Sequence, residues 1–172
     1  MAAQALIAQA LIAFGGNLGD PRATLTKAVA AFCDGGAVRL LARSSDYRTP
    51  PWGVENQPSF INAGIRVETS LAPQDLLARA LEVERRFGRD RAHETRWGPR
   101  SLDIDLIDYA GVECHGEDLT LPHPRALTRA FVLAPLAEIA PDWRIAGVTV
   151  ADALKRLDMT GIAKLSGHHP EV

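Results

Sequence analysis

Leu102-Asp103-Ile104-Asp105-Leu106 alternates apolar and acidic residues, which is the pattern of a β-strand with one buried and one polar face. The two aspartates therefore share one side of the predicted strand, while the three apolar residues enter the core. Carboxylates two residues apart on a strand lie ~6.5 Å from each other, and at an effective dielectric constant of about 20 they repel by about 2.5 kcal/mol. Since aspartate is also disfavoured in strands, the polar face of this one requires a positively charged partner.

A hard divalent cation is one partner that would offset this repulsion. Mg²⁺ held by one or two carboxylates and by substrate phosphates is the usual arrangement in enzymes that act on nucleotides. The alternative is a solvent-exposed strand face on which aspartate costs little, and an isolated Asp-x-Asp leaves both interpretations open. The preceding residues favour the cation, because Arg96-Trp97-Gly98-Pro99-Arg100 brings two guanidinium groups and an indole ring beside the carboxylates.

The chain uses arginine far more than lysine: of its 19 basic residues, only Lys27, Lys155 and Lys164 are lysines. The guanidinium fork binds phosphate in bidentate fashion, whereas lysine is a mobile point charge. Seven arginines fall in one interval, at positions 79, 85, 86, 89, 91, 96 and 100. The first three suit the solvated face of a helix, and the last four lie in a loop after Gly88. This loop is the predicted phosphate-binding segment.

Glycine-rich phosphate loops of the common types are absent from the sequence. No GxxxxGK[ST] occurs, and Gly15-Gly16-Asn17-Leu18-Gly19 is followed by no lysine, which excludes a Walker-type site. No GxGxxG occurs either, which excludes the common dinucleotide and protein-kinase templates. Phosphate would instead be bound by the arginine loop and by a metal on the aspartate pair.

The composition is that of one soluble globular domain: 172 residues, 47% of them hydrophobic, with a formal net charge of -2. We expect a core over residues 10–160 and a disordered tail over residues 166–172. Cys33 and Cys114 lack metal-ligand spacing and are expected to be free thiols. The apolar run at 5–14 is too short to span a membrane, and no basic residue precedes Arg22, so the expected location is the cytoplasm.

The predicted elements follow the order β-α-β-β-α-β and then continue as helices. A strand at 11–16 leads into a helix that Asp20 caps and Pro21 begins. The other expected strands are 38–47, 60–68, 102–109 and 119–121, the last pairing with 102–109 or a neighbour, and the other helices are 76–83, 131–139 and 150–157. Residues 48–58 form a stiff loop because of their prolines, and the strands flanking it should pair antiparallel. This order predicts an α+β fold, a ferredoxin-like antiparallel sheet sandwiched by helices.

Six segments, spread in order from about residue 11 to residue 141, carry a family resemblance. They are FGGNLGD at 14–20, YRTPPWG at 47–53, FINA at 60–63, RWGPRSLDIDLI at 96–107, LPHP at 121–124 and RAFVLAPL at 129–136. Together they resemble the 6-hydroxymethyl-7,8-dihydropterin pyrophosphokinases of folate biosynthesis, and the fourth segment is highly specific for that family. The resemblance implies transfer of the β,γ-pyrophosphoryl group of ATP to the hydroxymethyl oxygen of the pterin, with release of AMP.

The resemblance also implies a role for individual residues. Asp103 and Asp105 would hold two Mg²⁺ that bridge the triphosphate and lower the pKa of the attacking hydroxyl, and Arg89 and Arg100 would stabilise charge on the phosphates. Further contacts to ATP are implied for Glu84, Arg91, Arg100, Leu106, His123 and Arg129. Pterin contacts are implied for Thr49, Pro50, Trp52, Gly53, Phe60, Asn62, Trp97 and Phe131, with the ring stacked between the two phenylalanines.

Several of these residues also have a plain structural interpretation. Phe60 and Phe131 would, without the family context, more often be core residues, and Asn62 a strand amide with its bonds satisfied. Glu84 could equally be a solvated partner on an exposed helix face. Family resemblance further implies a monomer that acts on small molecules, with no nucleic acid or membrane partner.

Two rival functions are consistent with the same fold. An RNA-binding module is disfavoured by the net charge of -2 and by the lack of aromatic RNP motifs on the strands. A two-metal nuclease or phosphatase would need further acidic or histidine ligands. Neither Asp108 nor His123 lies at a spacing that demands such a site.

Overall fold

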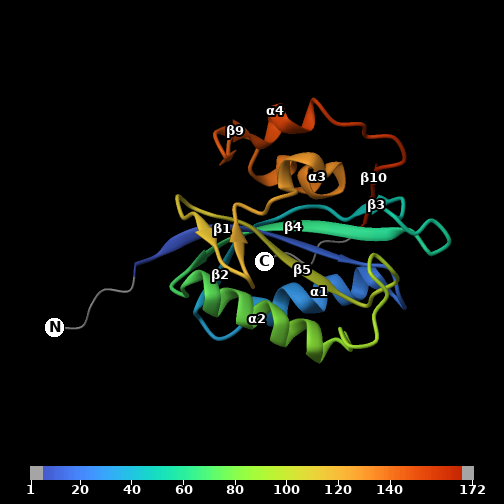
Figure 1. Ribbon diagram of the computed structural model, residues 1–172, viewed down its shortest axis with the longest axis horizontal. Helices are drawn as coiled ribbons and strands as arrows, with labels where there is room; N and C mark the ends of the chain where they lie inside the picture. The colour runs from blue at the N-terminus through green and yellow to red at the C-terminus, as the bar shows by residue number, and fades with distance from the viewer. Residues whose placement is uncertain (1–5, 168–172) are drawn as a thin grey trace.

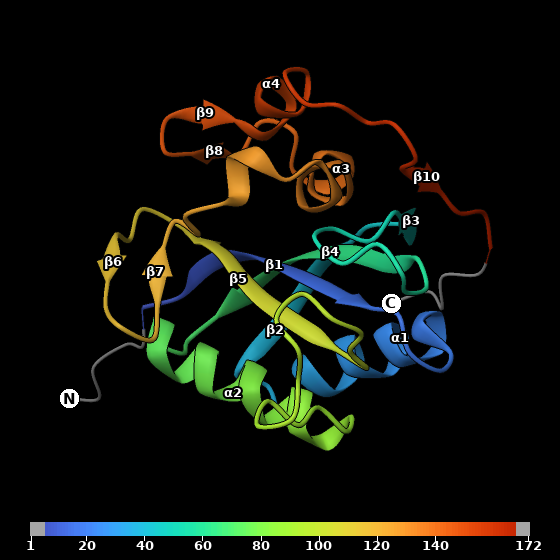
Figure 2. The same cartoon turned by 45° about the vertical axis from the view of Figure 1, so that its right-hand side comes forward.

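The computed structural model describes residues 6–167 of the chain. An antiparallel sheet separates two groups of helices, with α1 (Pro21–Phe32) and α2 (Pro73–Arg86) side by side on one face (Figure 1). On the opposite face lies α3 (Ala130–Ile139), with α4 (Val150–Leu154) stacked on it (Figure 2). Within the described range, no helix combines the length and the apolar character needed to cross a membrane.

The main sheet has six strands in the order β10-β3-β4-β1-β5, and β2 also pairs with β4. Their bounds are β1 Ala8–Gly16, β2 Val38–Arg43, β3 Tyr47–Thr49, β4 Phe60–Thr69, β5 Asp103–Tyr109 and β10 Ala163–Lys164. Outside this sheet lie two hairpins, β6 (Cys114–His115) with β7 (Thr120–Leu121) and β8 (Arg144–Ile145) with β9 (Val148–Thr149), and a 3-10 turn, η1 (Ala126–Thr128). The predicted α+β fold with an antiparallel sheet is confirmed.

The helices beneath the sheet begin and end where the sequence supplies the signals. Asp20 accepts a hydrogen bond from a first-turn amide at 3.1 Å, and Pro21 opens α1 as predicted. Arg79 of α2 donates to the Phe32 carbonyl at 2.6 Å, which satisfies one of the free acceptors at the end of α1. Gly88 follows α2 with a φ of +85°, a left-handed conformation that favours glycine.

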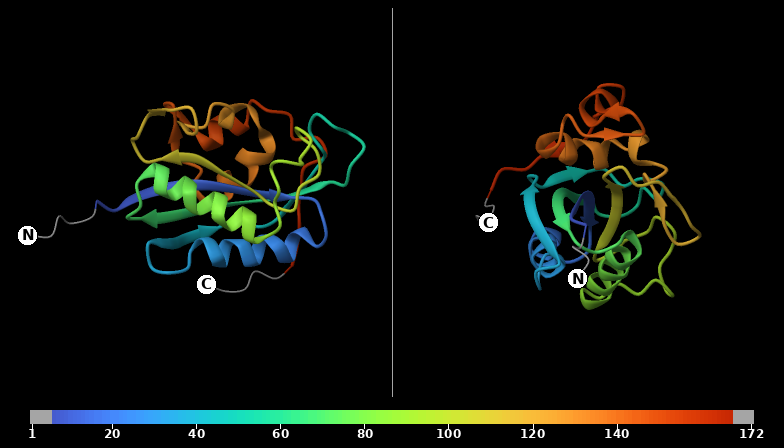
Figure 3. Two further views of the ribbon diagram at one scale, coloured as in Figure 1. Left: turned by 60° about the horizontal axis from the view of Figure 1, so that its bottom comes forward. Right: turned by 90° about the vertical axis from the view of Figure 1, so that its left-hand side faces the viewer.

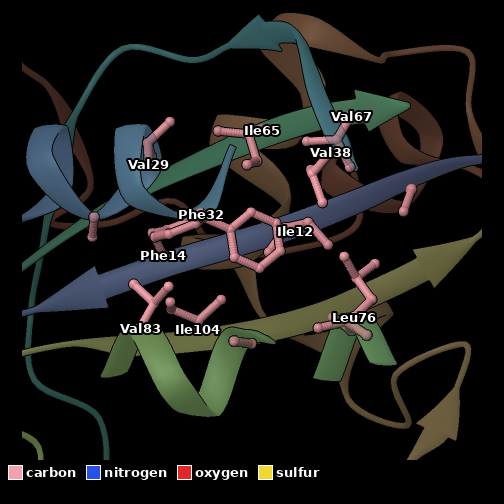
Figure 4. Close-up of a cluster of buried hydrophobic side chains, with 14 of the residues drawn as sticks. Ile12, Phe14, Val29, Phe32, Val38, Ile65, Val67, Leu76, Val83 and Ile104 are labelled. Carbon is pink, nitrogen blue, oxygen red and sulfur yellow. The ribbon is translucent and has the colours of Figure 1, made fainter. Parts of the chain in front are cut away.

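Strand β1 divides its side chains between two hydrophobic cores. Ile12 and Phe14 point toward α1 and α2, where the Phe14 ring meets Phe32 edge-on at 5.7 Å between centroids (Figure 4). Leu11 points to the other face and packs in the core beneath α3. Ala13, between Ile12 and Phe14, packs against the same core beneath α3.

The register between β1 and β5 fixes the position of the two aspartates. Asp105 lies opposite Ala13 and Asp103 lies opposite Gly15, while Ile104 between them enters the core with α1 and α2. Both carboxylates therefore lie on the α3 face of the sheet, which confirms the prediction that they share one side of a strand.

The prediction of a single strand over 38–47 is wrong, because a polar turn divides it into β2 and β3. The Ser44 amide donates to the Gly64 carbonyl at 2.9 Å, and its hydroxyl accepts from the Gly64 amide at 2.8 Å. Asp46 is buried next and accepts from Arg43 at 2.9 Å. Both new strands pair antiparallel with β4, as expected for the strands that flank the loop.

Other differences concern short elements. Residues 119–121 contribute β7, which pairs with β6 rather than with β5, and α4 ends at Leu154 rather than at residue 157. The two-residue strands β6, β8, β9 and β10 were not predicted, since two residues carry no periodicity. Of the tail predicted to be disordered, the Ser166 carbonyl accepts a bond from Arg22 at 3.3 Å, and residues 168–172 lie outside the described residues.

Candidate active site

A cavity of about 310 Å³ opens where β1 and β5 meet the start of α3. The loop between β3 and β4 and the loop between α2 and β5 lie together at this end of the sheet (Figure 3). The cavity wall includes most of the residues predicted from the sequence: Thr49, Pro50, Trp52, Phe60, Asn62, Arg89, Arg91, Trp97, Arg100, Asp103, Asp105, His123, Arg129 and Phe131. The structure therefore brings together segments that lie between Ala13 and Val132 in the chain.

The two aspartates are unequal in their surroundings. Asp103 accepts hydrogen bonds from Arg89 at 2.5 Å and from Arg100 at 3.4 Å. Asp105 makes no ion pair within residues 6–167. Its pKa is raised to about 7 because burial removes it from water and the charge of Asp103 lies close, while Arg129 offsets part of this effect. One carboxylate is thus neutralised by arginines, and the other is poised to bind a proton or a cation.

The donor set suits a cation that shares its ligands with a substrate. Among the described residues, no group of three or more histidine, cysteine or acidic side chains is arranged to hold a metal. Two carboxylates on one face, with arginines nearby, leave most coordination positions to water or phosphate oxygens, which is how Mg²⁺ is commonly bound. The raised pKa of Asp105 is the property that a bound divalent cation would reverse.

Glu84 anchors the arginine loop from behind the cavity and is not part of its wall. The Glu84 carboxylate is 1% exposed and accepts from Arg89 at 2.7 Å, Arg91 at 2.8 Å and the Ile104 amide at 2.8 Å. A buried carboxylate with such partners is held firmly in place. The interpretation of Glu84 as a solvated residue on an exposed face is therefore wrong.

Arg89 is the centre of this charge network. It is buried, and besides Glu84 and Asp103 it donates to Glu94 at 3.1 Å. Burial alone would lower the pKa of the Arg89 guanidinium, but the charges of Asp103 and Glu84 outweigh it and raise the pKa. The permanent positive charge of Arg89 is thus fixed at the edge of the aspartate pair.

Aromatic residues line the opposite half of the cavity. Phe60 stands at the start of β4 and Phe131 at the start of α3. Between them on the sheet, the Asn62 amide donates to the Thr49 hydroxyl at 2.7 Å. A Cβ at Gly15, the residue opposite Asn62, would lie 2.5 Å from the side-chain Oδ1 of Asn62, so glycine leaves room for the Asn62 amide in this orientation. We call these residues, Phe60, Phe131, Asn62, Thr49 and Gly15, the aromatic slot.

Two tryptophans meet at the mouth of the cavity. Trp97 has a φ of 59°, and its ring lies 5.1 Å from that of Trp52, which is half exposed. Gly53 is not part of the cavity wall. A Cβ on Gly53 would approach the Trp97 ring to 2.7 Å, so Gly53 permits the contact between the two loops. The Arg129 guanidinium lies 5.6 Å from the rings of both Trp52 and Phe131.

His123 and Leu106 differ in how they relate to the cavity. His123 is part of the wall, and burial together with the charge of Arg129 lowers its pKa to about 4. Because its Nδ1 accepts from the Arg125 amide at 3.1 Å, its Nε2 carries the proton at neutral pH. Leu106 is buried in the core with α1 and α2, so its side chain is not part of the wall.

Asn17 links the two loops, a role that was not predicted from the sequence. It is buried, and its side chain donates to the Gln57 side chain and to the Pro58 carbonyl, both at 2.9 Å. It exchanges two bonds of 3.0 Å with the backbone of Arg100. Gln57 in turn donates to the Trp97 carbonyl at 2.9 Å. Two sequence signals mark this residue: Asn17 follows the strand directly, and it lies in the FGGNLGD segment at 14–20.

Sequence comparison identifies relatives of the whole cavity-bearing region. The model of the family described as 7,8-dihydro-6-hydroxymethylpterin-pyrophosphokinase (HPPK) matches residues 11–141. The 2-amino-4-hydroxy-6-hydroxymethyldihydropteridine pyrophosphokinase of Methylorubrum extorquens is 47% identical over 157 residues, covering 91% of this chain and 98% of the relative. The protein of the same name from Pseudomonas aeruginosa is 37% identical over 163 residues, covering 94% and 99% of the two chains.

Solved structures support the fold. The crystal structure of Plasmodium falciparum HPPK-DHPS with pteroate has a TM-score of 0.69 over 91% of this chain, at 11% identity. A second HPPK-DHPS structure, in complex with substrates, has a TM-score of 0.66 over 87% of this chain, at 13% identity. This chain spans 43% of each of those longer chains. The fold, the match over residues 11–141 and the identity to full-length relatives agree, and the chain belongs to the 7,8-dihydro-6-hydroxymethylpterin-pyrophosphokinase family.

Proposed function

We propose that this protein transfers the β,γ-pyrophosphoryl group of ATP to the hydroxymethyl oxygen of 6-hydroxymethyl-7,8-dihydropterin and releases AMP, a step of folate biosynthesis. The observation that carries the proposal is that an aspartate pair and an aromatic slot open into one cavity. The first suits a magnesium-bound triphosphate, and the second suits a flat, hydrogen-bonding ring. The family relatives bear the name of this activity.

On the acidic side of the cavity, Asp103 and Asp105 would hold two Mg²⁺ together with the phosphates of ATP. The ions would supply charge neutralisation on the triphosphate and a lower pKa for the attacking hydroxyl. Arg89 and Arg100 contact Asp103 and would bind phosphate oxygens as negative charge moves to the leaving group. Since Glu84 fixes Arg89 and Arg91, it would act as a positioning residue for these phosphate contacts.

On the aromatic side, the pterin would stack between Phe60 and Phe131. Asn62 would read the polar edge of the ring, since Thr49 fixes its amide group and leaves its carbonyl oxygen as an acceptor. Pro50, Trp52 and Gly53 would close the ring from the loop side. This arrangement would point the hydroxymethyl group of the substrate toward the aspartate pair.

The two loops would exclude water from the reaction. Trp97 packs on Trp52, and Asn17 ties both loops to the end of β1, so the two loops would together cover bound substrates. His123 and Arg129 would contact the nucleotide, with neutral His123 donating through Nε2, and main chain near Leu106 would contact the base. We further propose that residues 10–160 form the core of one domain that acts as a monomer in the cytoplasm.

The test is AMP release from ATP and Mg²⁺ by the purified protein, measured with and without 6-hydroxymethyl-7,8-dihydropterin. AMP that forms only with the pterin is the expected result. Release of ADP, or hydrolysis independent of the pterin, would contradict the proposal and favour a phosphatase built on the same aspartates. Titration with single-stranded RNA adds a third arm, since binding that weakens with salt would favour a binding module.

A further inference from the structure

Glu138 lies in the last turn of α3, outside the cavity, and accepts several hydrogen bonds from the sheet. One carboxylate oxygen accepts from the Ser45 amide at 3.1 Å and from the Ser45 hydroxyl at 2.9 Å. The other accepts from the Tyr47 hydroxyl at 2.8 Å and lies 3.5 Å from the ammonium group of Lys164 in β10. Ser45 and Tyr47 are buried. We call Glu138, Ser45 and Tyr47 the α3 brace.

The brace holds β3, the shortest strand beside the aromatic slot. Tyr47 pairs with Asn62 and Thr49 pairs with Phe60 across the ladder to β4, so β3 has three residues to fix its place. On its outer side, β10 contributes only two paired positions, opposite Tyr47 and Arg48. Few main-chain bonds give a strand low local stability. The position of Thr49, and through it of the Asn62 amide, therefore depends on other contacts of β3.

Helix α3, which provides Glu138, is packed firmly against the sheet and can hold β3 in place. Leu133 and Leu136 are fully buried beneath it, and a Cβ on Gly64 of β4 would lie 2.7 Å from the Leu136 side chain. The absence of a side chain at Gly64 therefore lets α3 pack closely on β4 through Leu136. Phe131 stands at the other end of the same rigid helix, about 10 Å from Glu138. The brace thus connects the wall that carries Phe131 with the wall that carries Thr49.

The protonation states at neutral pH favour this connection. Burial works against the Glu138 charge, but the bonds from Tyr47 and Ser45 and the charge of Lys164 outweigh it and lower the pKa of Glu138. Burial raises the pKa of Tyr47, and the adjacent Glu138 raises it further. A neutral phenol therefore donates to a carboxylate, which makes a strong, directed hydrogen bond.

We propose that Glu138 is a positioning residue for the flat substrate: through Tyr47 and Ser45 it sets the place of β3, and so the separation of the two walls of the aromatic slot. The inference rests on the proposed function of the slot. Its effect falls on binding of the pterin ring. The aspartate pair and its arginines belong to β5 and to the loop after α2, which the brace does not contact, so binding of the magnesium nucleotide is unaffected.

The test uses Tyr47→Phe, which removes one hydroxyl and keeps the buried ring. We expect the KM for the pterin to rise about tenfold, with the KM for ATP and kcat within about twofold of wild type. Direct titration of the pterin into the protein should show the same loss of affinity. Glu138→Gln, which keeps one acceptor, should have a smaller effect than Glu138→Ala.

Tyr109→Phe is the matched control. Tyr109 is equally buried in the same sheet, and its hydroxyl donates to the Leu71 carbonyl at 2.8 Å, away from the cavity. Tyr109→Phe should lower the melting temperature and leave the KM for the pterin and the KM for ATP unchanged. If Tyr47→Phe behaves in the same way in an active enzyme, the inference is wrong. If the wild-type protein forms no pterin-dependent AMP, the proposed function itself is wrong. The failure of the inference and the failure of the proposed function are therefore distinguishable.

Discussion

At the scale of single residues, the aspartate pair shows how neighbours decide the character of a side chain. The sequence predicted two carboxylates that share one strand face and repel each other. In the structure, two arginines contact Asp103, whereas Asp105 is half-buried beside that charge without an ion pair in the described range. Their substitution should therefore affect activity in the same way and stability in opposite ways.

Replacing either aspartate by asparagine should reduce AMP formation more than about 100-fold. Without metal, Asp105→Asn should raise the free energy of unfolding by about 1 kcal/mol, because it removes a carboxylate that is shielded from water and lies close to the charge of Asp103. Asp103→Asn should lower it by about 1 to 3 kcal/mol, since the buried Arg89 loses a partner. Chemical denaturation in EDTA measures both. Equal shifts of the same sign in the two variants would contradict the asymmetry.

The raised pKa of Asp105 also predicts a pH dependence of stability. Its pKa is about 7 in the folded protein and 3.8 as the unperturbed value, so the folded state binds the proton more tightly. Stability of the metal-free protein should therefore fall as the pH rises from about 4 to about 7, and this contribution should then level off. Melting curves in EDTA should show wild type losing stability relative to Asp105→Asn over that range. If the difference in melting temperature between wild type and Asp105→Asn stays constant over this pH range, the predicted pH dependence is wrong.

At the scale of elements, the buried side chain of Asn17 holds the two loops at the cavity mouth in position. The loop between β3 and β4 and the loop between α2 and β5 have no helix or strand, yet both contact Asn17 at the end of β1. Four hydrogen bonds from a single residue couple their positions. The end of β1 therefore organises both sides of the cavity mouth.

Asn17→Ala should release both loops together. We expect backbone amides over residues 53–58 and 95–100 to exchange with solvent about tenfold faster or more, and stability to fall by about 1 to 3 kcal/mol. Hydrogen-exchange mass spectrometry measures the first effect. Asp20→Ala, which removes the cap of α1, is the control: it should cost about 1 kcal/mol without faster exchange in the loops. Faster exchange in only one loop would show that Asn17 does not couple them.

At the scale of the whole molecule, the sheet separates a stabilising core from a functional face. The core with α1 and α2 contains most of the largest fully buried side chains, and the face toward α3 carries a smaller core together with the charged and aromatic cavity. Under the proposed function, the two carboxylates would supply only some of the ligands of Mg²⁺, and phosphate oxygens would supply others. Metal and nucleotide should therefore stabilise the fold cooperatively.

Mg²⁺ with a non-hydrolysable ATP analogue, at about 100 times its Kd, should stabilise the protein by about 2.7 kcal/mol. Mg²⁺ alone at the same concentration should give much less, because the protein supplies few of the ligands. Thermal unfolding with each addition measures the difference, and Asp105→Asn should abolish it. Full stabilisation by Mg²⁺ alone would indicate a protein site complete without the nucleotide.

The sequence by itself determined the local features. Alternation defined β5 and the shared face of Asp103 and Asp105, and capping signals defined the start of α1. The motifs predicted most of the cavity wall. These features depend on residues within a few positions of each other, so periodicity and local chemistry are sufficient to detect them.

Only the tertiary structure decided which side chains meet. It divided the predicted strand 38–47 in two, buried Glu84 behind the arginines, and joined Asn17 to both loops. Glu138 and Ser45 are 93 residues apart, and no local pattern marks them as partners. Such contacts arise because the sheet brings distant segments together, and their energies depend on burial, which a sequence pattern does not specify.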